Sequence, residues 1–593
     1  MYGTLRGMKA SELHSVKPSS RSKTSSTLKQ KMNSGRLSLS LPGIRPGEWR
    51  FAGLVIMIML ILTSLPYTFA ALTVPPEKHF MGFILNVSDH SQYLAWYKGF
   101  QTAFLISNKL TPEPNPPIFF NLLWWMMGRF GLYTGLSYVV VYQIFRWIAG
   151  AFFLGMVYAF AALIFPGIQR RRVAFLVIAL GSGFGWILVV LKYTLMRGEL
   201  LFPLDVYIAE GNSFLCVLAY PHFAEAAGLI LAVLWLLVMG ERQGQLRYAV
   251  WAGLVAHFLG WQHGYDLLIV WGVPAVYIVA RWVRDRQLPT WWVKALFITG
   301  LLSWPPALYA VLLTRLDPTW KEVLAQFANA GVFTPSFPHM LILLGLPFIL
   351  AIAATVLSVR DALRHLADPT EPSLADAELF IGVWFVAGWA ITYIPTDFQI
   401  HMLNSWQVPI GLLATIGLFR YVKPTLEQRW GTGRLAPLVI PVFIVLILLT
   451  NLYLLMWRFV DLNRYNYPYY LYRDEVAAME WLADHSPPDA IVLSSYDTGR
   501  YVPALSERRA FLAHWAQTLD FYDKRERVER FFDADVDDAE RLETLQTFGV
   551  DYVIYGPAER ALGQYNPGGS PLFSAAFSNP QVTIYRVNGE EVS

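Results

Sequence analysis

The residues best suited to chemistry stand in the segment NVSDHSQYLAWYKGF, 86–100, just past a long apolar run. This segment places Asp89 and His90 side by side among aromatic residues. A carboxylate held near a membrane surface, partly out of water, can have its pKa tuned and can serve as a general base. Asp89 could also bind a metal ion. Alternatively, it could cap a helix that begins at His90, because aspartate is a favoured N-cap residue.

Further acids, histidines and amides recur in segments assigned below to the same side of a membrane. The candidate substrate-binding residues are Glu113, Arg197, Asp205, Glu210, His222, His263, Asp266, Gln399 and His401. His222 in AYPHF and His263 in WQHGYD stand out because they interrupt apolar sequence. Each residue alone is more often a helix cap or a satisfied loop residue, and Arg197 also fits an interfacial anchor. The stronger signal is that these residues gather on one side.

The chain that positions these residues has the composition of a membrane protein. Of its 593 residues, 55% are hydrophobic and 15% are charged, against about 25% charged residues in soluble proteins. Runs of about 18 apolar residues are long enough to cross roughly 30 Å of hydrocarbon. We predict an α-helical polytopic protein with eleven spans: 51–72, 135–165, 173–193, 223–240, 248–262, 266–282, 293–314, 337–358, 379–394, 406–420 and 436–457.

Lysine and arginine divide unevenly between the segments that separate these spans. The N-terminal 50 residues and every second segment after them hold 25, whereas the other segments up to residue 405 hold 7. The richer side is cytoplasmic. We therefore expect a disordered basic cytoplasmic tail at 1–48, a transmembrane domain at 49–457 and an extracytoplasmic domain at 458–593. This arrangement predicts a multi-pass protein of the plasma (inner) membrane, and the tail is too long and too polar for a cleavable signal peptide.

Two outer segments have a character of their own. The first loop, 73–133, mixes aromatic and apolar residues with proline, which predicts amphipathic helices at the membrane interface, separated by PEPNPP at 112–117. The C-terminal segment is charged and alternates in pattern, which predicts a small α/β domain. Its expected helices are 473–486, 521–534 and 537–547, and its expected strands are 490–495, 551–556 and 582–587.

Several function classes find no support in the sequence. The single cysteine, Cys216, excludes an intrachain disulfide and a cysteine-rich zinc site. There is no Walker A loop and no strand–GxGxxG–helix pattern, and GSGFG at 181–185 lies inside a predicted span, where small residues favour helix packing. The net charge of +4 gives no indication of nucleic-acid binding.

The order of these parts resembles the GT-C class of membrane glycosyltransferases, which includes protein mannosyltransferases, aminoarabinose transferases and oligosaccharyltransferases. The resemblance spans about residues 50–593 and is strongest to poorly characterised prokaryotic members. It rests on the Asp89-His90 pair, the TPEPNPP-like segment, PHF near the fourth span, the HGYD turn, and WLADHSPPDAIVLSS with GVDYVIYGP near the C-terminus.

The resemblance implies a reaction. A polyprenyl-phosphate or polyprenyl-diphosphate donor would give its sugar, mannosyltransferase-like, to a glycan, lipid or protein acceptor of the cell envelope at the outer face. Asp89 would be the catalytic base and His90 its support. Many members carry two acids in this loop, whereas this chain has Asp89-His90. That departure leaves the base and the need for a divalent metal, Mg²⁺ or Mn²⁺, open, and no cofactor is certain.

Two other functions remain open on the sequence. A lipid or solute transporter, or flippase, would show a water-lined path through the bundle and often repeated halves. A membrane sensor would use the outer domain to bind a ligand. A pocket joining the first loop to a lipid-sized lateral groove would favour the enzyme.

Overall fold

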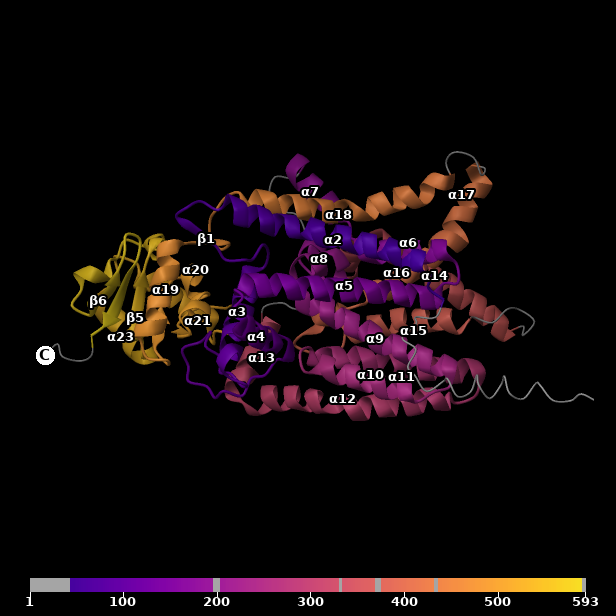
Figure 1. Cartoon of the computed structure of the whole chain (residues 1–593), viewed down its shortest axis with the longest axis horizontal. Helices are drawn as coiled ribbons and strands as arrows, with labels where there is room; N and C mark the ends of the chain where they lie inside the picture. Colours follow the sequence, from indigo (N-terminus) through magenta and orange to yellow (C-terminus); the bar gives the residue numbers. More distant parts are fainter. Residues whose placement is uncertain (1–42, 196–202, 330–332, 368–374, 431–435, 589–593) are drawn as a thin grey trace, which may run out of the picture. The chain divides into compact units, whose positions relative to one another are not determined.

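The computed structural model describes residues 43–195, 203–329, 333–367, 375–430 and 436–588. The expected tail at 1–48 lies almost wholly outside the described residues. The described chain is mostly helical, with two small sheets (Figure 1).

Seven helices of the described residues are long and apolar enough to cross a membrane. They are α2 (Pro46–Thr73), α5 (Tyr138–Ile164), α9 (Pro221–Gln243), α11 (Leu267–Asp285), α12 (Thr290–Leu316), α14 (Phe337–Ala367) and α18 (Val439–Leu462). The helices α6 (Ile168–Leu180) and α7 (Gly185–Thr194) would make an eighth span together, bent by 45°. The protein is therefore built as a multi-pass membrane protein.

The expected number of eleven spans is not confirmed, although ten of the expected ranges each fall on a helix and 173–193 falls on the two helices α6 and α7. Three of these helices are short: α10 (Arg247–Gly260), α15 (Asp376–Thr392) and α16 (Gln407–Gly417), with 14, 17 and 11 residues. The last continues through a π-helical turn, Leu418–Val422, into α17 (Lys423–Trp430).

The third expected span is broken at GSGFG instead of running straight through it. Neighbouring groups approach these glycines closely: a Cβ atom on Gly183 would lie 1.9 Å from the carbonyl oxygen of Ile342, and one on Gly185 would lie 2.0 Å from Asp205 Oδ1. The small residues therefore let a loop and a helix pack into the break, whereas a packing patch within a straight helix was expected.

Several pairs of these helices pack against each other. Helix α5 contacts α9, α9 contacts α10, α10 contacts α12, and α14 contacts α16 (Figure 1). The short helix α8 (Ser213–Ala219) is buried along its whole length. It contacts α2, α5 and α9, so the segment that leads to His222 is enclosed by long helices.

The first loop forms two helices, as predicted, on either side of PEPNPP. They are α3 (Val87–Thr102) and α4 (Leu122–Thr134), which pack against each other. Strand β1 (Lys78–Phe80) pairs antiparallel with β2 (Tyr470–Tyr472), so the loop is tied to the segment after α18. Their place at a membrane interface stays a prediction. A further helix, α13 (Pro318–Asn329), follows α12.

The C-terminal segment folds around a five-stranded sheet with the order β4-β3-β5-β7-β6. Strands β3 (Ile491–Leu493), β4 (Arg509–Ala510) and β5 (Tyr552–Tyr555) run parallel, and β6 (Phe573–Ser578) and β7 (Thr583–Val587) complete it antiparallel. The helices are α19 (Arg473–His485), α20 (Tyr496–Gly499), α21 (Val502–Leu505), α22 (Phe521–Phe531), α23 (Asp538–Phe548) and α24 (Pro557–Arg560). The three expected helices and three expected strands are confirmed, whereas β4, β6 and three short helices were not predicted.

Candidate functional site

Asp89 lies in the first turn of α3. The helix begins at Val87, after Asn86 in the left-handed region (φ 41°), and the side-chain amide of Asn86 donates to Asp89 Oδ2 at 2.5 Å. The expectation that Asp89 caps a helix beginning at His90 is therefore wrong. Its carboxylate stands near the positive end of the helix, where negative charge is favoured.

The second oxygen of Asp89 meets a histidine that is far away in the sequence. His514 Nε2 lies 3.1 Å from Asp89 Oδ1. The other ring nitrogen, Nδ1, accepts the backbone N–H groups of Ala516 and Gln517 at 3.0 and 3.2 Å, so the ring hydrogen sits on Nε2 and is donated to Asp89. The His514 side chain is 1% exposed and that of Asp89 27% exposed.

This environment keeps Asp89 ionised. Burial by itself would raise the pKa of Asp89, but the hydrogen bond from His514 and the electrostatic attraction of its N–H dipole, with smaller contributions from His90 and Asn86, lower the pKa below its ordinary value. The carboxylate is therefore available as a proton acceptor at neutral pH, and it is held in a fixed direction by two donors.

His90 has a packing role in this structure. Its Nδ1 lies 2.9 Å from the carbonyl oxygen of Asn86, and its Nε2 lies 2.8 Å from both the Tyr142 hydroxyl and the carbonyl oxygen of Ala219. Burial lowers the pKa of His90, although its backbone hydrogen bonds oppose the shift. These contacts join α3 to α5 and α8, and the expected support of Asp89 comes chiefly from His514.

The position of His222 is set by the end of α8. The last three carbonyl groups of that helix accept hydrogen bonds from Arg146, Tyr67 and Tyr142, in that order. They fix the turn into α9, which begins with Pro221. His222, the next residue, places its Nε2 3.2 Å from the hydroxyl of Tyr93 on α3.

Three histidines gather beside Tyr93. The rings of His222 and His263 lie 5.5 Å apart between centroids. His263 Nδ1 is 3.2 Å from Asp266 Oδ2, which also accepts from the side-chain amide of Asn404 at 2.9 Å. His263 precedes a 3-10 turn, Gly264–Asp266, that starts α11.

The third histidine is His401, in a 3-10 turn at Gln399–Leu403. It bonds to the carboxylate of Glu210, in the turn Ala209–Gly211, and Tyr265 stacks on its ring with centroids 5.2 Å apart. Burial would lower the pKa of His401, but Glu210 raises it above its ordinary value, which favours the imidazolium. We call His222, His263, His401, Glu210 and Asp266 the histidine cluster.

Tyr93 links Asp89 to the histidine cluster. Tyr93 follows Asp89 by four residues and so shares its helix face, and Tyr93 contacts His222. Tyr207 lies within the electrostatic reach of both groups: burial first, and then the charges of Asp89 and Glu210, raise its pKa to about 12. Five of the predicted substrate-binding residues are thus brought together near the predicted base.

Other predicted residues lie apart or have different partners. Asp205 is buried and accepts the backbone N–H of Gly185 at 3.1 Å, and burial raises its pKa to about 6. Gln399 accepts the N–H of Thr334 and donates to the carbonyl oxygen of Ile394, so it joins its own loop to the segment before α14. Arg197 lies outside the described residues.

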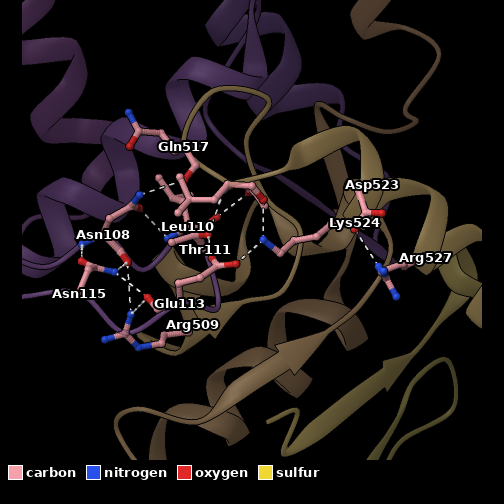
Figure 2. A network of polar contacts seen from close by, with 12 residues as sticks. Asn108, Leu110, Thr111, Glu113, Asn115, Arg509, Gln517, Asp523, Lys524 and Arg527 are labelled. Carbon is pink, nitrogen blue, oxygen red and sulfur yellow. Dashed lines mark hydrogen bonds and ion pairs between the residues drawn. The ribbon is translucent and has the colours of Figure 1, made fainter. Parts of the chain in front are cut away.

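Glu113 also has a separate place. Its Oε1 pairs with the ammonium of Lys524 on α22 at 2.5 Å, and its Oε2 accepts from the Thr111 hydroxyl (Figure 2). The structure therefore joins Glu113 to the C-terminal segment and does not bring it to the histidine cluster.

Two features bear on donor and metal binding. In the described ranges, no three His, Cys, Asp or Glu side chains converge as a metal ion would require, and both oxygens of Asp89 already accept hydrogen bonds. A hollow of about 350 Å³ lies between the first loop and the C-terminal end of α12, lined by Ile118, Tyr309, Leu312, Leu313, Leu316 and Asp317. Five of these six side chains are apolar or aromatic, so the hollow is mainly apolar.

No protein-family model matches the sequence, and a search of curated proteins finds no match. Among solved structures, the chain is similar to the apo oligosaccharyltransferase of Archaeoglobus fulgidus, with a TM-score of 0.53 and 13% identity over 85% of this chain and 69% of that chain. The complex of that enzyme, AglB, with an inhibitory peptide and a dolichol-phosphate has a TM-score of 0.53 and 11% identity over 86% and 70%. ArnT from Cupriavidus metallidurans bound to undecaprenyl phosphate has a TM-score of 0.49 and 12% identity over 92% and 98%.

The two similarities to the oligosaccharyltransferase, both with a TM-score of 0.53, show a shared fold. The resemblance to the GT-C class of membrane glycosyltransferases is therefore confirmed at the level of the fold.

Proposed function

We propose that this protein is a membrane glycosyltransferase that moves a sugar from a polyprenyl-phosphate or polyprenyl-diphosphate donor to an acceptor at the outer face of the membrane. The observation that carries the proposal is the ionised Asp89, held by His514 beside the histidine cluster, in a chain with the GT-C fold. The sugar and the acceptor, which is a glycan, a lipid or a protein, stay unassigned.

The roles follow from the chemistry of each group. An acceptor hydroxyl must lose its proton as it attacks the anomeric carbon, and a positioned carboxylate can take that proton. Asp89 is the proposed base, and the N–H of His514 orients it. The departing phosphate needs positive charge or hydrogen-bond donors, which His401, His222 and His263 would supply.

The donor class is supported by the groove and by the similar fold. The apolar hollow beside Ile118 suits an isoprenoid tail. AglB, which shares the fold, has been solved with a dolichol-phosphate. AglB has also been solved with Zn and sulfate, but the described residues of this chain form no ready metal site, so no step is assigned to a metal.

The domain boundaries and the orientation belong to the same proposal. We infer a cytoplasmic tail at 1–48, a transmembrane domain at 49–457 and an outer domain at 458–593, in the plasma (inner) membrane. Outer-face transfer requires the first loop and the C-terminal domain to lie on the same side, and the contact between Asp89 and His514 supports that arrangement.

The test measures loss of labelled sugar from a panel of polyprenyl-phosphate and polyprenyl-diphosphate sugars, using purified protein in lipid nanodiscs. Because a general base contributes roughly 10²–10⁴-fold, Asp89→Asn should lower turnover at least about a hundredfold. Asp523→Asn, an exposed carboxylate on α22, is the matched control and should leave turnover unchanged.

The other outcomes separate the alternatives. Turnover that survives Asp89→Asn would keep the enzyme and remove Asp89 as its base. If no donor is turned over and none binds, the protein is a transporter, flippase or membrane sensor instead.

A further inference from the structure

The loop at 511–519, which we call the His514 loop, is built to hold one histidine still. The hydroxyl oxygen of Thr518 accepts the backbone N–H groups of Ala513 and His514 at 3.0 and 3.1 Å. The backbone N–H groups of Ala516 and Gln517 point to His514 Nδ1. The loop's own backbone therefore fixes both the main chain and the ring of His514.

Besides the contact between Asp89 and His514, the first loop forms three hydrogen bonds with the His514 loop. The amide of Asn108 donates to the carbonyl oxygen of Gln517 at 2.9 Å, and Thr518 donates to that of Leu110 at 2.5 Å. The backbone N–H of Leu519 donates to the Thr111 hydroxyl at 3.1 Å. Figure 2 shows these contacts between two segments that lie about 400 residues apart in the sequence.

The buried ammonium group of Lys524 connects these contacts to α22. Lys524 on α22 has a side chain that is 1% exposed, and its ammonium donates to Glu113 Oε1 and to the carbonyl oxygen of Leu519, both at 2.5 Å. Glu113 in turn accepts from Thr111. The four groups form a ring that joins the first loop, the end of the His514 loop and α22.

Such an ion pair is a costly way to gain stability alone, because desolvation offsets much of the attraction. A neighbouring pair on the same helix, Arg527 and Asp523, is solvent-exposed, with side chains that are 38% and 56% exposed (Figure 2). The Glu113–Lys524 pair, in which Lys524 is buried and Glu113 is half-buried, differs from it because the Lys524 ammonium also donates to the backbone of Leu519. Its geometry therefore points to a role in placing the loop.

A third element holds the same loop from another side. The side-chain amide of Gln326 on α13 donates to the carbonyl oxygens of Ala516 and Thr518 at 2.9 and 3.1 Å. Helix α13 thus contacts the C-terminal segment directly beside His514.

We propose that the Glu113–Lys524 pair is a positioning device that holds the His514 loop against the first loop, so that the N–H of His514 stays on the Asp89 carboxylate. Lys524 and Glu113 are positioning residues, because they touch neither Asp89 nor the histidine cluster. The inference deepens the proposed function and rests on it where turnover is the readout.

The first test is a double-mutant cycle on turnover of a polyprenyl-phosphate sugar. A displacement of about 1 Å can cost about a hundredfold, so Lys524→Met should lower turnover at least about tenfold. Arg527→Met, one turn further along α22, should change it less than about twofold. If Lys524 acts through His514, then Lys524→Met should add nothing to the loss caused by His514→Leu.

The second test needs no activity. Hydrogen–deuterium exchange of the intact protein in nanodiscs should show faster exchange across 511–519 in Lys524→Met and unchanged exchange in Arg527→Met. Turnover losses that multiply in the double variant, or exchange at 511–519 that does not change, would overturn the proposal. A wild-type protein without turnover would end the proposed function, while the exchange experiment would still decide how the loop is anchored.

A milder pair of variants tests the same proposal if Lys524→Met does not fold. Thr111→Val removes the hydroxyl that joins Glu113 to Leu519, and Thr111→Ser keeps it. The Thr111→Val variant should show faster exchange at 511–519 and slower turnover than wild type. The Thr111→Ser variant should match wild type in both measurements. Equal behaviour of the two variants would show that the ring does not position the loop.

Discussion

At the residue scale, the site depends on a carboxylate whose partner is locked in one tautomer. Because two backbone N–H groups occupy Nδ1 of His514, only its Nε2–H can face Asp89. A hydrogen bond to the ionised form lowers the pKa of an acid, whereas burial raises it. At Asp89 the hydrogen bond from His514 and the other electrostatic contributions outweigh burial, so the pKa of Asp89 is lowered and its carboxylate is ionised at neutral pH.

This balance predicts a change in the pH dependence of turnover. In His514→Leu, burial is no longer opposed by the histidine, so the pKa of Asp89 should rise and the acid limb of the kcat profile should move to higher pH. His514→Gln can still donate a hydrogen bond and should move the limb less. The measurement is turnover against pH for the three proteins.

The free energy of unfolding should also depend on pH, with the sign that the lowered pKa of Asp89 sets. A carboxyl group whose pKa is lowered by folding contributes stability that is present above its unfolded pKa and is lost as the pH falls through the folded value. In wild type this loss should come below the ordinary range of aspartate. An acid limb that does not move in His514→Leu would mean that His514 does not control Asp89.

Sequence reasoning found one half of this pair and missed the other. Asp89 stands out because it follows an apolar run among aromatic residues. His514 carries no comparable signal, since FLAHWAQT has neither a helical nor a strand period and the partner lies 425 residues away. His90 was singled out by adjacency alone, and its direction toward Tyr142 and Ala219 depends on packing.

At the scale of elements, short helices position the site, and these are the elements that periodicity detects least well. Helix α20 packs its last residue, Gly499, against the His514 loop: a Cβ atom there would lie 2.1 Å from the carbonyl oxygen of Leu512. The long helices were predictable because a membrane demands long apolar runs. Breaks such as Gly183 were not, because they depend on neighbours from other segments.

The close approach at Gly499 predicts a selective effect. Gly499→Ala should destabilise the C-terminal segment by about 1–3 kcal/mol, the usual cost of overpacking, and should slow turnover by moving the His514 loop. Gly569→Ala is the control, because no atom lies within 4 Å of the added Cβ. Apparent Tm in nanodiscs and turnover measure both effects, and equal Tm values for the two variants would contradict the expected clash.

At the scale of the whole molecule, the proposed chemistry depends on two regions that meet. The first loop supplies Asp89, the C-terminal segment supplies His514, and the sheet pair β1–β2 ties the two regions together. Both regions were expected on one side from the distribution of lysine and arginine. Their contact could not be expected, because nothing in a single sequence marks which loops touch.

The orientation of the chain is therefore the remaining large-scale prediction. Native Cys216 is buried, so a cysteine introduced at an exposed position reports which side of the membrane it occupies. Glu526→Cys, in the C-terminal segment, should react with a membrane-impermeant maleimide in right-side-out vesicles. Gln287→Cys, in the positively charged loop between α11 and α12, should react only after the membrane is permeabilised.

The physical reason is the excess of 25 over 7 basic residues, which biases such loops toward the cytoplasm. Cys216→Ser carrying no introduced cysteine gives the background. If Gln287→Cys reacts in sealed vesicles and Glu526→Cys does not, then Asp89 and His514 face the cytoplasm. Sugar transfer at the outer face would then be excluded, while a glycosyltransferase working from inside the cell would still be compatible with the site.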